Sequence, residues 1–223
     1  MLSDAMALAR KDLLVEVRAR EALASGLALA GIALVVVGLA VGPSPARLRE
    51  LAPALVWTAL LYVAIAVAER FDRIDRSDDA SAGLWLVLAD RRAIFLGRVL
   101  SLSIVLALLQ LAIWAGAAIL LDLPITATTV ALVPLSAITA LTAASATALV
   151  QPLVADANHR PLLLPVALLP LLVPTFLAGV QTGAAVLDGR LLDTGGWVVA
   201  LLIEAALFLG LGVLAFETAV SPE

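Results

Sequence analysis

Cysteine is absent from the 223-residue chain, and histidine and lysine occur once each, as His159 and Lys11. Without cysteine the chain has no disulfide, thiolate metal site or iron–sulfur cluster. A single histidine cannot supply a two-histidine metal site within one chain. A phosphate-binding P-loop needs Gly-Lys-Ser/Thr, whereas Lys11 is followed by Asp12, so any ATP site must lie on another polypeptide.

Charge is also scarce. Only 14% of the residues are charged and 63% are apolar, whereas soluble domains have about 25% charged and about 45–50% apolar residues. Mean hydropathy is +1.10. A soluble fold of this size could not bury so much apolar surface. The composition therefore excludes a soluble enzyme, a disordered chain and a nucleic-acid binder, and it predicts an integral membrane protein.

Long charge-free runs divide the sequence into segments of membrane-spanning length. A bilayer core needs about 20 apolar helical residues. Five such runs carry no charge, and a sixth contains one acid, Glu204. They predict an all-α membrane protein with one six-helix transmembrane domain over residues 22–217. The predicted spans are 22–42, 51–68, 99–121, 125–154, 161–187 and 196–216.

Basic residues lie mainly on one side of these spans. The segments before span one, after span two and after span four carry 11 of the 14 Lys and Arg residues, and the other side carries three. Loops rich in Lys and Arg stay in the cytoplasm. We therefore expect a multi-pass protein of the cell membrane with both termini cytoplasmic.

Residues 1–21 precede the first span. Leu2, Met6, Ala9, Leu13 and Val17 recur at helical spacing, and Asp12 and other charged residues lie away from that face. The pattern predicts an amphipathic helix at the cytoplasmic membrane surface. The alternative is a frayed, solvated leader.

The stretch 69–98 is the one long polar segment, and we expect a cytoplasmic loop there. It is dense in both charge signs up to Asp79, and then becomes apolar over 84–88, which includes Trp85. A short apolar helix in a charged loop needs a covering surface. That surface is either a docked protein or the lipid interface, and the residues alone leave both open.

Two spans carry residues that are unusual in a bilayer. Span five has prolines at 161, 165, 170 and 174, which bend a helix because each removes a backbone hydrogen bond. This span is either a kinked packing helix or an element that lines a cavity. Glu204 either faces the bundle interior as a functional group or lies near the outer interface.

Several stretches resemble a known family in order and spacing. They are residues 9–18, the outer turn Gly42-Pro43-Ser44-Pro45, the run 51–57 continuing to Glu69-Arg70, and the Leu/Pro-rich run 161–178. With the six spans, the leading helix and the polar loop, they resemble the membrane subunit of ABC-2-type exporters with an elbow helix and a coupling helix. Within that group the chain is similar to CcmB, the haem exporter permease of cytochrome c maturation. It departs from the family where Ala80-Ser81 replaces Gly-Ser and Arg160-Pro161 replaces Gly-Gly.

The resemblance implies a non-catalytic permease subunit in haem export or haem-chaperone release, with ATP bound and hydrolysed by a separate CcmA-type ATPase. Further implied partners are a haem-handling CcmC-type membrane protein, a small single-span subunit and a second copy of this chain. Haem is then a substrate, and we expect the chain itself to bind no cofactor or metal. The implied ATPase-coupling residues are Phe71, Asp75, Asp78, Asp79, Ser81, Leu84 and Trp85. Possible functional residues within the membrane are Trp57, Pro165, Pro170, Pro174 and Glu204. The alternatives are an ABC permease for a drug, lipid or glycan, and a membrane scaffold without transport.

Overall fold

The computed structural model describes residues 2–77, 92–154 and 160–218, and this part of the chain is helical, without a β-strand. It also contains two short 3-10 helices: η1 (Ala127–Ala131) precedes the long helix that begins at Leu132, and η2 (Leu191–Thr194) precedes the last one, which begins at Gly195. The predicted all-α class is confirmed. The α-helices are α1 (Leu2–Ala19), α2 (Glu21–Val41), α3 (Pro45–Ser77), α5 (Arg92–Leu120), α6 (Leu132–Leu153), α7 (Arg160–Leu187) and α8 (Gly195–Thr218).

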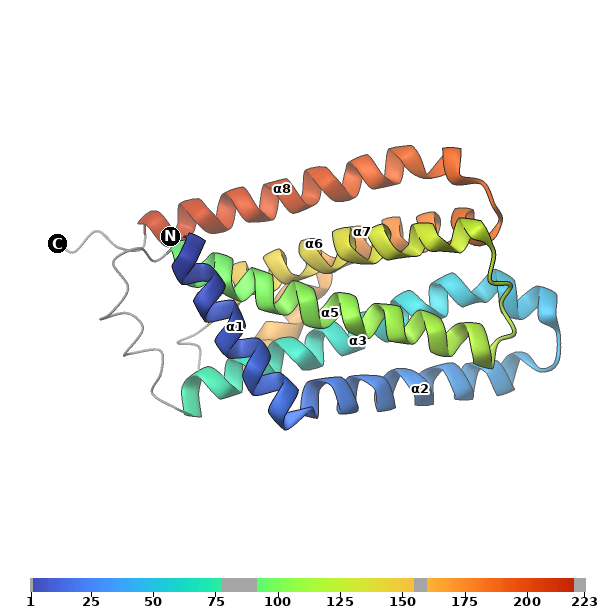
Figure 1. The fold of residues 1–223 in the computed structure, drawn as a ribbon, viewed down its shortest axis with the longest axis horizontal. Coiled ribbons are helices and arrows are strands. Elements are labelled where there is room, and N and C mark those ends of the chain that lie inside the picture. Colours follow the sequence, from blue (N-terminus) through green and yellow to red (C-terminus); the bar gives the residue numbers. More distant parts are fainter. Residues whose placement is uncertain (1, 78–91, 155–159, 219–223) are drawn as a thin grey trace.

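Six of these helices, α2 to α8, are long and apolar enough to cross a membrane, with spans of 19 to 29 residues. The prediction of a multi-pass membrane protein is therefore confirmed. The six helices run along the long axis of the molecule, and α1 crosses them steeply at one end (Figure 1). We call this end the α1 end and the opposite one, which holds the turns around residues 42–44, 121–126 and 188–190, the far end.

Two helices extend well beyond the predicted spans. Helix α3, which holds the second predicted span, begins at Pro45 and continues to Ser77. Helix α5, which holds the third, begins at Arg92. Pro45 is suited to the first helical position, where its missing N–H would have no partner in any case. The expected polar loop 69–98 is therefore wrong at both ends, because residues 69–77 and 92–98 are helical. A charge-free run marks the membrane crossing, whereas a helix can continue beyond it into water.

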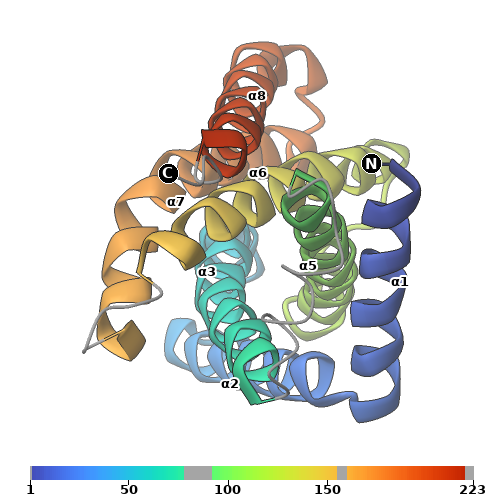
Figure 2. The ribbon, with the colours of Figure 1, turned by 90° about the vertical axis from the view of Figure 1, so that its left-hand side faces the viewer.

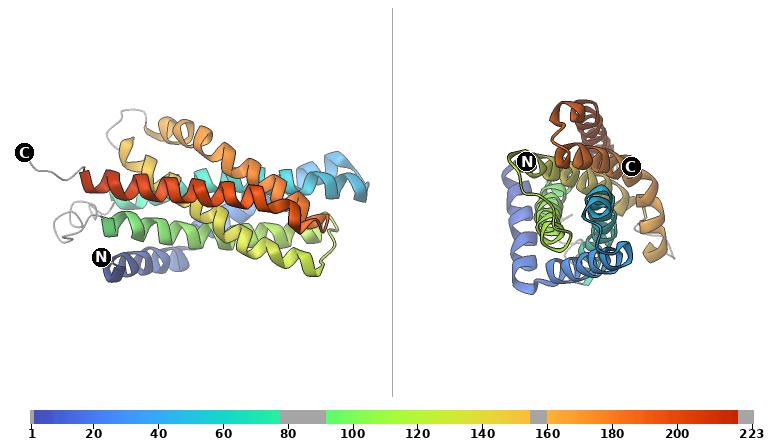
Figure 3. Two further views of the ribbon diagram at one scale, coloured as in Figure 1. Left: turned by 90° about the horizontal axis from the view of Figure 1, so that it is seen from above. Right: turned by 90° about the vertical axis from the view of Figure 1, so that its right-hand side faces the viewer.

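The bundle has an inner and an outer set of helices. Seen from the α1 end, α3 and α5 lie in the middle, with α8 at one edge and α2 at the opposite edge (Figure 2). The view from the far end shows the same order (Figure 3). In the most apolar stretch of each span, 56% of the residues of α3 are buried, against 17% in α2 and 22% in α8. The outer helices α2 and α8 thus leave most of their surface to lipid or to other proteins.

Helix α6 packs closely through small residues. Ala143, Ala144 and Ala146 are buried between the neighbouring helices, as expected where small side chains let backbones approach. The hydroxyls of Thr139 and Thr142 donate to the carbonyl four residues earlier, at 2.8 and 2.9 Å. Each hydroxyl also reaches an acceptor on another helix, Gln110 Oε1 of α5 at 3.1 Å from Thr139 and the Leu201 carbonyl of α8 at 3.4 Å from Thr142, so these polar groups connect α6 with its neighbours.

Helix α7 is unbroken from Arg160 to Leu187 although it contains Pro165, Pro170 and Pro174. Pro170 and Pro174 lie on its exposed side, whereas Leu168 and Leu172 of the same helix are fully buried in the core. The prolines therefore remove backbone hydrogen bonds at intervals of four or five residues without ending the span.

Candidate functional site

The carboxylate of Glu16 joins three helices at the α1 end. Glu16 is 2% exposed. Its Oε1 accepts a hydrogen bond of 3.1 Å from the backbone N–H of Leu23, in the first turn of α2. Its Oε2 lies 3.2 Å from Nε of Arg70, near the end of α3. A carboxylate at a helix N-terminus also interacts favourably with the helix dipole. One side chain of α1 thus holds the start of α2 and the end of α3.

Asp12 makes the corresponding connection to α5. Its Oδ2 lies 3.8 Å from Nη1 of Arg98 and 3.3 Å from the hydroxyl of Ser101, which can donate to it. Its Oδ1 faces Nζ of Lys11 at 3.3 Å. Asp12 and Arg98 are both about one-seventh exposed, 14% each. This pair is longer and wetter than Glu16–Arg70, so we expect it to contribute less to stability.

Two further contacts connect α3 with its neighbours at the same end. The guanidinium of Arg98 lies over the ring of Phe71, 5.5 Å from its centroid, within the range of a cation–π interaction. The side-chain amide of Gln151 on α6 donates a 2.9 Å hydrogen bond to the carbonyl of Ala68. The polar groups here therefore connect α1, α2, α3, α5 and α6.

Close approach of α1 to α5 depends on a glycine. A Cβ built on Gly97 would lie 2.9 Å from Cβ of Leu8 and 3.0 Å from the carbonyl oxygen of Ala5. Ala5 and Ala9 are buried in the same contact. The small residues bring Asp12 and Glu16 within reach of their arginines. We call the set Asp12, Glu16, Gly97, Arg70, Arg98 and Ser101 the α1 clamp.

The face of α1 that packs on the bundle overlaps only in part with the apolar face predicted from the sequence. The leader prediction of a helix within residues 1–21 is matched by α1. Of the predicted apolar face, Leu2, Met6 and Val17 are 72%, 65% and 59% exposed, whereas Ala9 is buried and Leu13 packs against the core. The packed face also carries Asp12 and Glu16. An apolar face directed away from the protein is suited to a lipid surface.

In the sequence, Arg70 of the α1 clamp precedes the predicted coupling residues and Arg98 follows them, with Phe71 directly after Arg70. Phe71, one of the coupling candidates, is 4% exposed within α3 and so belongs to the helix that leads into the segment. Asp75 lies further along the same helix. Five other candidates lie outside the described residues, as does His159: they are Asp78, Asp79, Ser81, Leu84 and Trp85.

Trp57 packs in the core against α7. It is fully buried and meets the ring of Phe176 edge-on, with centroids 6.0 Å apart and planes at 70°. A Cβ on Gly179 would lie 2.7 Å from its ring carbons, and a Cβ on Gly183 would lie 3.1 Å from its Nε1. Gly179 and Gly183 therefore form a groove for the indole. Among the described residues nothing accepts a hydrogen bond from Trp57 Nε1.

Glu204 lies at the middle of the α8 span, which runs from Leu191 to Phe216. Helix α8 begins at Gly195, so Glu204 is about 14 Å along it at 1.5 Å per residue. It is half-buried, beside the Thr175 hydroxyl of α7. Glu204 is therefore about two and a half turns into α8, and its functional role in the membrane stays a prediction.

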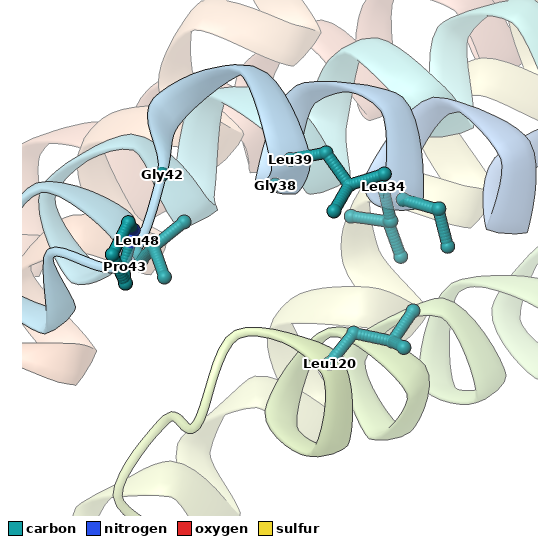
Figure 4. Close-up of a pocket in the computed structure, with 8 residues that line it drawn as sticks. Leu34, Gly38, Leu39, Gly42, Pro43, Leu48 and Leu120 are labelled. Atoms are coloured by element: carbon teal, nitrogen blue, oxygen red, sulfur yellow. The ribbon is translucent and has the colours of Figure 1, made fainter.

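A groove at the far end is lined by described residues without a polar side chain. It is a groove of about 420 Å³ between α2, the start of α3 and the end of α5 (Figure 4). Its walls are aliphatic or glycine and proline, so nothing in it can orient a polar ligand. The lining residues are Leu34, Val35, Gly38, Leu39, Gly42, Pro43, Leu48 and Leu120.

An exposed ion pair marks the far-end turn after α7. Arg190 donates hydrogen bonds of 2.9 Å to Asp188 and to Asp193. These bonds, that to Asp188 first, raise the pKa of Arg190 above its ordinary value. All three side chains are at least half exposed, in contrast to the α1 clamp. In the described part of the chain no three acidic or histidine side chains gather as a metal site.

Comparison with known protein families identifies the family of this chain. The pattern of the family described as CcmB protein matches residues 3–222, nearly the whole chain. The chain belongs to the CcmB family. This membership and the six spans make it a membrane permease subunit of haem export in cytochrome c biogenesis. No curated protein matches it by sequence.

The α1 clamp was missed by reasoning from the sequence of this CcmB chain. The available signal was the pair Asp12 and Glu16, four residues apart and in register with the small residues Ala5 and Ala9. Small residues that continue into acids on one helix face indicate a face packed against protein rather than lipid. The arginine partners lie 54 and 86 residues further along the chain, so the fold alone shows the pairing.

Proposed function

We propose that this chain is the permease half of an ABC transporter acting in haem export, or in release of a haem-loaded chaperone, for cytochrome c biogenesis. ATP is hydrolysed by a separate CcmA-type ATPase. The observation that carries the proposal is the match to the CcmB family over residues 3–222 of a chain with six spans. The sequence supports a separate ATPase, because its one lysine is not in a P-loop.

The ATPase docks on the end of α3 and the segment between α3 and α5, through Asp75, Asp78, Asp79, Ser81, Leu84 and Trp85. The bias of basic residues puts this segment in the cytoplasm, with both termini. The α1 clamp supports the assignment, because Arg70 and Arg98 hold the two helices that enter and leave the segment to one helix, α1. Force applied to the segment would then move α3, α5 and α1 together.

Membership of the CcmB family supports the other partners that we propose. They are a haem-handling CcmC-type membrane protein, a small single-span subunit and a second copy of this chain, which together complete the transporter. Haem is a substrate, and ATP is bound by the partner. The exposed surfaces of α2 and α8 support contacts with other membrane proteins.

Co-purification tests ATPase docking. The double variant Asp78→Arg with Trp85→Glu should lower recovery of the ATPase with the tagged chain, because it reverses a charge and puts a carboxylate on an apolar contact. Asp193→Arg with Leu192→Glu is the matched control at the far end, where both residues are exposed. Unchanged recovery from the first variant would contradict docking at this segment.

Deletion of the gene tests the haem assignment. We expect loss of c-type cytochromes on a haem-stained gel, accumulation of the haem-loaded chaperone, and recovery of both on adding back the wild-type gene. Normal cytochrome levels without chaperone accumulation would reject the assignment and would favour another substrate.

A further inference from the structure

In the described part of the chain, Glu204 has few hydrogen-bond donors and no cation nearby to offset the cost of a carboxylate in the membrane. It lies at mid-span on α8. A carboxylate at that depth costs about 2.5–3.5 kcal/mol on insertion scales, so such residues face a partner or a wet cavity. A carboxylate offers about four acceptor positions on its two oxygens. An acid at this depth therefore needs several donors or a cation.

The neighbouring polar group supplies little of this. The Thr175 hydroxyl lies within interacting reach of the Glu204 carboxyl, but it makes no hydrogen bond of ordinary geometry to any described residue. In the described spans, basic residues occur only within about two turns of a helix end. The described part of the chain therefore brings no cation to the centre of α8.

Glu204 opens onto an uncovered face of α8. Ala200, Leu207 and Leu211 are exposed and lie at i−4, i+3 and i+7 from Glu204, which places them on the same side of the helix. Leu201, Ala205 and Phe208 are buried against the bundle on the neighbouring side. Figure 1 shows α8 along one edge of the bundle. The acid therefore lies at the boundary between the packed side and the open side.

We propose that this face, Ala200, Glu204, Leu207 and Leu211, docks a transmembrane helix of a different protein that brings a hydrogen-bond donor or cationic side chain to Glu204. The donor is a guanidinium, ammonium, imidazole, hydroxyl or amide at mid-membrane depth. The inference rests on the proposed function in that the partner is another membrane subunit of the same transporter.

A second copy of the chain suits this face less well than a different protein. In a two-fold dimer the same patch meets itself, so a contact centred on α8 would bring two Glu204 carboxyls together. Two ionised carboxylates repel strongly in a medium of low dielectric, so at least one of them would have to take up a proton. A donor or cation from a different chain lets Glu204 keep its charge, and charge complementarity therefore favours a different chain.

Photo-crosslinking in the intact complex tests the docking surface. A benzophenone side chain replaces Leu207, 54% exposed, or Leu202, 49% exposed and on another side of α8. We expect Leu207 to crosslink to a different membrane protein and Leu202 not to do so. Adding Glu204→Leu should lower the crosslink about tenfold, as expected for loss of a hydrogen bond to a charged group.

Glu204→Leu is compatible with folding, because it puts an aliphatic side chain at a lipid-accessible position, and its yield and melting temperature should match the wild type. A crosslink to a second copy, labelling of lipid alone, or a crosslink that Glu204→Leu leaves unchanged would each overturn the inference. The amount of co-purified ATPase in the same sample reports separately on the proposed function.

Discussion

At the α1 end, Glu16 and Asp12 lie 3.2 and 3.8 Å from arginine nitrogens of two other helices, whereas Glu204, in the middle of the α8 span, lies beside the Thr175 hydroxyl. The first two acids have their partners within the chain. The third lies on a helix of which most is exposed. The difference supports the proposal that Glu16 and Asp12 hold the subunit together and that Glu204 meets another protein.

The largest effect should come from breaking the Glu16–Arg70 pair. Arg70→Met removes the arginine next to a carboxylate that is 3% exposed. Removing one partner of a buried ion pair destabilises by about 3–5 kcal/mol. Chemical denaturation in detergent should show this loss in the free energy of unfolding. A change as small as that of an exposed pair would mean that water reaches Glu16.

Packing inside the membrane should be the next most sensitive feature. Gly179→Ala puts a Cβ 2.7 Å from ring carbons of Trp57, and overpacking of this kind costs about 1–3 kcal/mol. The melting temperature in detergent should fall. Gly210→Ala is the control, because nothing lies within 4 Å of its Cβ position. Equal melting temperatures for the two variants would contradict the close contact between α3 and α7.

Loosening α1 should have a smaller effect on stability but a clear structural readout. Gly97→Ala forces Leu8 and Ala5 away from α5. Because the chain has no cysteine, a single cysteine introduced at Ala9, which is 2% exposed, can report on the contact. Maleimide labelling of that cysteine should accelerate in the Gly97→Ala background. An unchanged labelling rate would show that α1 tolerates the added methyl group.

The smallest effect should come from the exposed ion pairs at the far end. Arg190→Ala removes hydrogen bonds to Asp188 and Asp193, but solvent screens such pairs. We expect no measurable change in unfolding or in ATPase recovery. A clear loss in either would show that the comparison between buried and exposed charges fails at this end.

Much of the fold could be predicted because each membrane-crossing helix leaves a long run without charged residues in the sequence. The six spans were found in this way, since any helix that crosses lipid needs about 20 apolar residues. The helix ends were missed at Pro45, Ser77 and Arg92. Outside the bilayer, charged residues occur in helices as well as in loops, so composition does not show where a helix ends and a loop begins.

The site was less predictable for a different reason. Periodicity assigned Asp12 to the solvent side of the leader, but Gly97 and the small residues of α1 let α5 approach that side. The pairing of Glu16 with Arg70 depends on the position of α3 in space. Glu204 was recognised as unusual from the sequence, and the start of α8 at Gly195 places it about two and a half turns into that helix.

The most direct test of the α1 clamp is a double-mutant cycle on Glu16 and Arg70. Glu16→Gln keeps an acceptor for the N–H of Leu23 and removes the charge, Arg70→Met removes the other charge, and the double variant removes both. If the two charges hold α1 to α3, the double variant is less destabilised than the sum of the singles by about 1–3 kcal/mol. Additive losses, within about 0.5 kcal/mol of the sum, would contradict a clamp in which these side chains act together.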